Sequence, residues 1–233
     1  MSSSSESDWK RLIRFVAVED GKEHFGQPVD DKADIGLLAS KGNKIQAYEI
    51  VGDNVPFNGW VDIDTVYTVK KLSAPIRRDQ AGGSIRLLGA NFKRHIEEAG
   101  IAKPKEPVLM IVPRTALAGP GDIPIPPFVH KGKDQLDYES ELAVIIGKDA
   151  RDVPREKAFD YVLGDWIFNV QDAISFLSNG TTLEAGTVIQ MGTPSGVGWF
   201  KDPKGLIKDG DTFSALEKGA VEFTWPNSGL AAS

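Results

Sequence analysis

Cysteine is absent from the 233 residues, and histidine occurs only three times. The absence of cysteine excludes disulfides, thiolate metal sites and thiol nucleophiles. Any metal ion would therefore have to be held by oxygen ligands or by His24, His95 and His130. Long apolar runs are missing too, since no window reaches the ~18–20 residues that a membrane-spanning helix requires. We therefore expect no membrane association.

The chain also lacks an excess of basic residues. It has 27 Lys and Arg against 33 Asp and Glu, for a formal net charge of −6. Binding to phosphates needs clustered Lys and Arg, so we expect neither nucleic acid nor an anionic membrane as a partner. Residues 1–11 begin Ser-rich and acidic and have no apolar core of a secretory signal. They predict a flexible tail on a cytoplasmic protein.

Short strand-like runs dominate what is present. Alternating patterns at 12–18, 44–51 and 66–69 predict a small β-rich domain over residues 12–78. Pro75 to Gly83 is either a linker or an ordered surface loop. From Ser84 the pattern changes to a strand followed by a short helix that ends at Gly100.

The remainder mixes strands with a few helices. Residues 104–127 are rich in proline and should be extended and turn-rich, not helical. The most regular strand pattern is Tyr138–Gly147. Helices are predicted at 156–163 and 170–177, and later strands at 185–192 and 212–216. Together these patterns predict an α+β protein that is mostly β.

Glu139 and Glu141 are two residues apart in the predicted strand, so both carboxylates should face the same way. Two like charges that close are unfavourable unless a cation or a proton lies between them. A hard ion such as Mg²⁺ suits oxygen ligands. The alternative is an edge strand whose acidic side chains face solvent.

His95 and Glu98 are three residues apart on the predicted helix and share a face. A carboxylate beside an imidazole fixes its tautomer and suits a general base that acts on water. The alternative is a surface ion pair of little energetic value.

A glycine-rich turn, Gly192 to Gly198, follows a predicted strand. Its backbone N–H groups and the Thr193 hydroxyl are suited to receiving a carboxylate or an oxyanion. It lacks the Lys-Ser/Thr ending of a phosphate loop, and Ser195 lacks the frame of a nucleophile elbow. A purely structural turn remains the alternative, and a serine hydrolase that uses Ser195 is a remote one.

These segments together resemble the fumarylacetoacetate hydrolase (FAH) family. The resemblance extends from about Arg14 to near the C-terminus and is carried by Leu88–Glu98, Ala116–Pro126, Asp137–Lys148 and Thr182–Val197. The resemblance implies an FAH-type mixed β-roll catalytic domain, here 84–233, with a small N-terminal domain and a homodimeric assembly. It also implies dependence on Mg²⁺ or Mn²⁺ and cleavage of a C–C bond in ketonic substrates, by hydrolysis in acylpyruvates or β-diketo acids or by decarboxylation in oxaloacetate.

The resemblance further implies a role for each candidate residue. Glu139 and Glu141 match two metal ligands, and His95 with Glu98 matches a water-activating pair on a lid helix. Thr193, in the turn that begins at Gly192, matches a residue that holds the carboxylate of a 2-oxo acid substrate. In the decarboxylase version of the chemistry CO₂ leaves, and the base has less to do.

The sequence departs from the family pattern at one junction. Tyr161–Gly164 matches the start of a family strand, whereas the residues from Asp165 onward match a much later helix. A central block is therefore missing at 164/165, and with it the third metal ligand and an active-site Lys. Asp165 or Asp172 is a conceivable replacement ligand, and Val112 stands where the family usually has Lys. We expect a shortened form with reduced or absent activity, or else a non-catalytic FAH-fold protein that binds a 2-oxo acid or a partner chain.

Overall fold

The computed structural model of the protein describes residues 8–124, 128, 136–161, 170–208 and 211. Several predictions therefore lie outside the described residues: most of the tail, His130, the junction at 164/165, Asp165 and the strand at 212–216.

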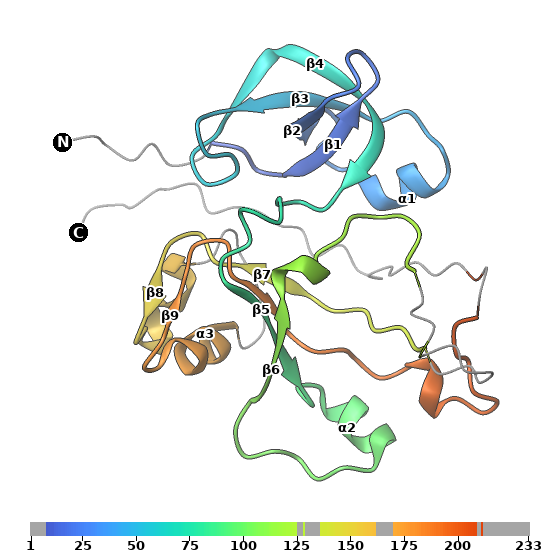
Figure 1. The fold of residues 1–233 in the computed structure, drawn as a ribbon, viewed down its shortest axis with the longest axis vertical. Helices are drawn as coiled ribbons and strands as arrows, with labels where there is room; N and C mark the ends of the chain where they lie inside the picture. Colours follow the sequence, from blue (N-terminus) through green and yellow to red (C-terminus); the bar gives the residue numbers. More distant parts are fainter. Residues whose placement is uncertain (1–7, 125–127, 129–135, 162–169, 209–210, 212–233) are drawn as a thin grey trace.

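The N-terminal region forms a closed barrel of four antiparallel strands (Figure 1). These strands are β1 (Ile13–Ala17), β2 (Glu23–Pro28), β3 (Gln46–Val51) and β4 (Trp60–Ser73). Alternation places Phe15, Ala17 and Ala47 inside, where they are fully buried. Closure pairs every strand on both sides, so this half has no free sheet edge. A short helix, α1 (Ile35–Ser40), begins at Asp34, whose side chain accepts from the Leu37 N–H.

Residues 74–83 lead from the barrel into the second half of the chain. Ile76 and Ala81 in this stretch are buried against Ile85 and Val188 of the next sheet. The stretch is therefore a packed, ordered loop, which is one of the two alternatives that its composition allowed.

The second half is organised by a mixed sheet in the order β6-β5-β10-β7. Its strands are β5 (Ser84–Gly89), β6 (Val108–Pro113), β7 (Ala143–Ile145) and β10 (Val188–Gln190). β5 pairs antiparallel with β6 and parallel with β10, and β10 pairs antiparallel with β7. β8 (Ala150–Arg151) and β9 (Thr182–Leu183) form a separate ladder. The prediction of a mostly β, α+β protein is confirmed.

A helix packs against the part of this sheet that contains β7 and β10. α3 (Val170–Ser178) buries Val170, Ile174 and Leu177 in the largest core cluster, together with Val144 and Ile189. α2 (Lys93–Ala99) ends at Gly100, which has the left-handed φ of 65° that favours glycine.

The helix predicted over 156–163 is instead a 3₁₀ helix, η2 (Arg155–Tyr161). It begins with a bond from the Lys157 N–H to the Pro154 carbonyl, three residues back, which is the 3₁₀ spacing. Within the described part of the chain, no helix combines the length and the apolar content that crossing a bilayer would need.

β6 is the exposed edge of the mixed sheet. Val108, Leu109, Met110 and Ile111 are between 39% and 63% exposed, although successive side chains point to opposite faces. Neither face of this strand is therefore covered by the described residues. Among those residues β6 pairs only with β5, so its outer backbone groups have no ladder partner.

Candidate active site

α2 carries the proposed acid–base pair. His95 Nδ1 and Glu98 Oε1 are 2.8 Å apart, and the side chains are 16% and 22% exposed. A carboxylate only accepts, so in a neutral imidazole the proton lies on Nδ1 and the lone pair on Nε2. This arrangement leaves Nε2 as the nitrogen that can take a proton from water.

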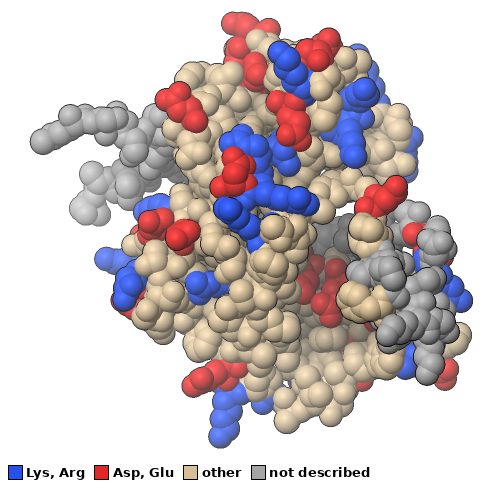
Figure 2. All heavy atoms as spheres, viewed as in Figure 1, with Lys and Arg blue, Asp and Glu red and all other residues tan. Residues whose placement is uncertain are grey.

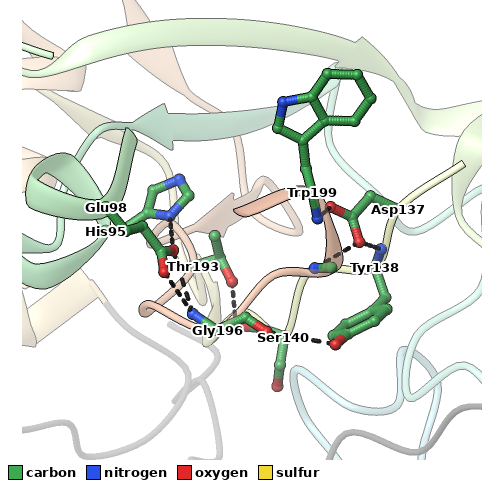
Figure 3. A network of polar contacts seen from close by, with 9 residues as sticks. His95, Glu98, Asp137, Tyr138, Ser140, Thr193, Gly196 and Trp199 are labelled. Atoms are coloured by element: carbon green, nitrogen blue, oxygen red, sulfur yellow. Dashed lines mark hydrogen bonds and ion pairs between the residues drawn. The ribbon is translucent and has the colours of Figure 1, made fainter. Parts of the chain in front are cut away.

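Glu98 also joins α2 to the turn that follows β10. The Gly196 N–H donates to both carboxylate oxygens of Glu98, at 3.2 and 3.1 Å (Figure 3). The helix cannot swing away from the turn without breaking this charged hydrogen bond.

The segment with Glu139 and Glu141 differs from its prediction. Both glutamates precede β7, which begins only at Ala143, so their placement on a strand was wrong. The Met191 N–H donates to the Leu142 carbonyl at 2.9 Å, and this bond is where backbone pairing with the β10 side stops. On the N-terminal side of Leu142, hydrogen bonds that involve side chains hold the segment in place of ladder bonds.

These side-chain contacts fasten the segment to the turn after β10. The Thr193 hydroxyl donates to the Ser140 carbonyl at 3.3 Å, and the Gly192 N–H donates to Glu141 Oε2 at 3.1 Å. The sequence suggested the Thr193 hydroxyl and the N–H groups of this turn as substrate-binding donors. In the structure they also position the segment that carries the glutamates. Thr193 is buried, whereas Glu139 is exposed and Glu141 is half-buried.

The surroundings of Glu141 shift the pKa of its carboxyl. Burial is the main cause that raises the pKa of Glu141, and the nearby Glu139 carboxyl raises it further, while the Gly192 N–H acts in the opposite direction. A pair of carboxylates with uncompensated charge fits a hard divalent cation. Figure 2 shows acidic side chains inside a hollow on this face of the molecule.

The described part of the chain assembles no third ligand beside this pair. No group of three or more His, Asp and Glu suited to a metal ion is found among the described residues. Asp172 lies on α3 and forms an ion pair with Arg155. His24 lies in the barrel between Asp20 and Glu49, each 3.0 Å from a ring nitrogen. Neither residue joins the glutamates.

Gly192 is at a position that only glycine fits. Its φ is 87°, and a Cβ there would lie 2.6 Å from the Leu88 carbonyl oxygen. Close approach of the β5 end and the turn after β10 brings the start of α2 beside this turn, and Asn91 Nδ2 adds a bond to the Met191 carbonyl at 2.8 Å.

Asp137 is a structural residue of the site that sequence reasoning did not single out. Its carboxylate accepts from the N–H groups of Tyr138, Gly198 and Trp199 at 2.8, 2.9 and 2.7 Å (Figure 3). It thereby caps the short 3₁₀ helix η3 (Gly198–Phe200). The two partners in η3 are 61 and 62 residues away, so no local spacing reveals the role.

The fold is that of FAH enzymes. The solved fumarylacetoacetate hydrolase of Exiguobacterium antarcticum superposes with a TM-score of 0.56, over 85% of this chain and 92% of that one, at 22% identity. The model of the fumarylacetoacetate (FAA) hydrolase C-terminal family matches residues 84–169 and 164–224. The chain belongs to the fumarylacetoacetate hydrolase family, which confirms the resemblance seen in the sequence.

The chain is also similar to two curated relatives that are named for an activity. The chain is 38% identical to a caffeoylpyruvate hydrolase of Neonothopanus nambi over 274 aligned positions, covering 96% of this chain and 91% of that protein. It is 28% identical to the oxaloacetate tautomerase YisK of Bacillus subtilis, over 60% of this chain and 67% of that one. Caffeoylpyruvate and oxaloacetate, for which these two relatives are named, are both 2-oxo acids.

Proposed function

We propose that the protein is a divalent-metal-dependent hydrolase that cleaves the C–C bond of acylpyruvates or related β-diketo acids. The observation that carries this proposal is that Glu98, which is paired with His95, and Glu141 both accept from N–H groups of one turn, those of Gly196 and Gly192. Similarity to an enzyme named for caffeoylpyruvate supports an acylpyruvate as the substrate.

Glu139 and Glu141 are the residues that would hold Mg²⁺ or Mn²⁺. When bound there, the ion supplies a Lewis acid for the 2-oxo acid end of the substrate. Gly192 keeps Glu141 in place through its N–H, and the nearby Thr193 is proposed to hold the substrate carboxylate. The two ends of an acylpyruvate would then lie toward different elements, the 2-oxo acid at the glutamates and the acyl carbonyl toward α2.

His95 is the proposed general base. Its Nε2 takes a proton from water, the resulting hydroxide attacks the acyl carbonyl, and the C–C bond to the pyruvate methylene breaks. The protonated imidazole then returns its proton to that methylene carbon, so the products are a carboxylic acid and pyruvate. Glu98, 2.8 Å from Nδ1, stabilises the imidazolium while it exists.

Release of pyruvate tests this assignment. We expect acylpyruvate turnover in Mg²⁺ that chelation abolishes, and a loss of about 10²-fold or more in His95→Gln. Glu97→Gln on the same helix is the matched control, because Glu97 is exposed on another face and only pairs with Lys93 at 3.8 Å. Metal-independent turnover, or equal rates in the two variants, would contradict the proposal.

The proposed activity is reduced because a central block is missing at 164/165. Two findings support this. The family model matches in two segments that meet at residues 164–169. The alignment to the Neonothopanus relative has 274 positions, more than the 233 residues of this chain, so it contains residues without a counterpart here.

The transcript provides the direct check on the missing block. Sequencing across the codons of Gly164 and Asp165 should give the junction without intervening coding sequence. A transcript that carries an in-frame insert there would mean that the active protein is the longer form. In that case metal binding and activity should be compared between the two forms.

Oxaloacetate is the second candidate substrate, as in a decarboxylase-type member, and similarity to an oxaloacetate tautomerase favours it. Parallel assays for enol–keto exchange, CO₂ release and acylpyruvate hydrolysis distinguish the reactions. If all three assays are negative while pyruvate still binds, the protein is a non-catalytic FAH-fold binding protein.

The assembly is proposed to be a homodimer in the cytoplasm. The uncovered apolar strand β6 supports association, because an exposed edge with apolar side chains readily pairs with another chain. Ile111→Lys should shift the molar mass measured by light scattering toward the monomer. An unchanged mass would remove β6 from the interface.

A further inference from the structure

One exposed phenylalanine contacts the proposed general base, and a second immediately precedes the helix that carries it. Phe92 immediately precedes α2 and is 37% exposed, and Phe200 ends η3 and is 40% exposed. The rings of Phe200 and His95 meet edge to face, with centroids 6.0 Å apart and planes at 68°. Single exposed aromatics are common on protein surfaces, so their placement has to carry the argument.

The position of Phe200 is fixed by the same bonds that build the site. Asp137 accepts from the N–H groups of Gly198 and Trp199, and Glu98 accepts from that of Gly196. η3 is thereby tied both to the glutamate segment and to α2. Phe200 is therefore held beside His95 by two charged hydrogen-bonded anchors and is not on a free loop.

Phe92 is held by neighbouring contacts. The adjacent Asn91 donates to the Met191 carbonyl, and a Cβ built on Gly192 would lie 3.7 Å from Phe92 Cδ2. The Phe92 ring thus lies against the turn that binds Glu141. The two phenylalanines approach the site from different segments, α2 and the turn after β10.

The proposed reaction determines which part of the substrate lies beside these rings. Water activated by His95 attacks the acyl carbonyl, so the substituent on that carbonyl must lie beside His95. A methyl group there would leave both phenylalanine rings in water. A flat aryl or arylvinyl group would bury them and gain edge-to-face contacts.

We propose that Phe200, with Phe92, is a specificity-determining residue that selects acylpyruvates whose acyl group is aromatic. This inference rests on the proposed function, because it takes the position of the acyl carbonyl from His95. It adds the substrate class: an aromatic acyl group carried on pyruvate.

Two substrates that differ only in the acyl group provide the test. Benzoylpyruvate and acetylpyruvate are compared by kcat/KM in the unaltered protein, in Phe200→Leu, and in Trp60→Leu. Trp60 is an exposed aromatic on β4 of the barrel and serves as the control. We expect the unaltered protein to prefer benzoylpyruvate. Phe200→Leu should lower kcat/KM for that substrate about threefold to tenfold, mainly through KM.

The same variant should change acetylpyruvate turnover less than twofold, and Trp60→Leu should change neither. An equal fall for both substrates would overturn the inference, since Phe200 would then act through His95 or through folding. Absence of any preference for the aryl substrate in the unaltered protein would overturn it as well.

Binding separates this inference from the proposed hydrolysis. If neither substrate releases pyruvate, the proposed function fails, and calorimetric titration with the same two compounds in Mg²⁺ decides the inference alone. Tighter binding of benzoylpyruvate that weakens in Phe200→Leu would support the inference. Equal affinities for the two compounds, or an affinity that Phe200→Leu leaves unchanged, would overturn it.

Discussion

The barrel and the mixed sheet differ in how they satisfy the backbone groups at their strand edges. β1 to β4 close on themselves, so each strand has two partners and the interior is filled by Phe15, Ala17 and Ala47. The mixed sheet is open, with short β7 at one end and exposed β6 at the other. The barrel completes its ladders within one contiguous stretch of chain, whereas the residues that the structure describes leave the apolar strand β6 of the sheet uncovered.

This difference explains why the candidate site lies in the second half of the chain. In the barrel the backbone groups are used by the ladders. In the second half the ladder from β10 to β7 stops at Leu142, and the next residues are held by side chains and by turn N–H groups. Glu139 and Glu141 lie on a segment that is fixed without being part of a strand. His95, on α2, is tied to the same turn through Glu98.

The largest expected effects come from emptying one core at a time. Phe15 and Ile174 are both fully buried, in the barrel and on the inner face of α3 respectively. Phe15→Ala and Ile174→Ala should each lower the free energy of unfolding by about 2–5 kcal/mol. Hydrogen exchange followed segment by segment should show the loss confined to the altered half. Equal loss of protection in both halves would mean that the two regions unfold as one unit.

A smaller effect is expected at the turn that joins the site. Gly192→Ala combines an unfavourable positive φ with an approach of 2.6 Å to the Leu88 carbonyl oxygen. It should cost about 3 kcal/mol, chiefly in the second half. Gly42→Ala is the control, because Gly42 has a φ of 68° and nothing within 4 Å of the added Cβ. Its cost should be about 1 kcal/mol, and equal costs in thermal denaturation would refute the steric argument.

The smallest expected effect is on the pH dependence of stability and comes from the charge of Glu141. The raised pKa of Glu141 means that the folded protein holds this proton more tightly than the unfolded chain does. Its contribution to stability is present below the ordinary Glu pKa of 4.5 and is lost as the pH rises through the raised value. In the metal-free protein, Glu141→Gln should therefore be more stable than the unaltered protein at pH 7. The difference should vanish at acid pH.

Thermal unfolding in a chelator, scanned across pH, measures this difference. Glu97→Gln serves as the exposed control and should leave the pH profile unchanged. A Glu141→Gln protein that is less stable at neutral pH would show that the carboxylate is already compensated by groups within the chain.

Local patterns predicted the parts of the fold that local interactions determine. β1 follows its alternating run, and α2 stops where Gly100 provides the left-handed conformation. His95 and Glu98 were paired correctly because one helical turn separates them. The strand expected across Glu139 was wrong, because alternation does not say which residues find a ladder partner. Asp137 and Phe200 owe their roles to contacts across the fold, which spacing along the chain does not encode.

Binding of Mn²⁺ tests the central claim most directly, because the ion substitutes for Mg²⁺ and its resonance signal changes on coordination. Titration of the unaltered protein, Glu139→Ala, Glu141→Ala and the control Glu97→Gln would be followed by electron paramagnetic resonance. We expect weak binding that both glutamate variants abolish and that Glu97→Gln leaves intact. Identical titration curves for all four proteins would contradict the assignment of the metal site and the function built on it.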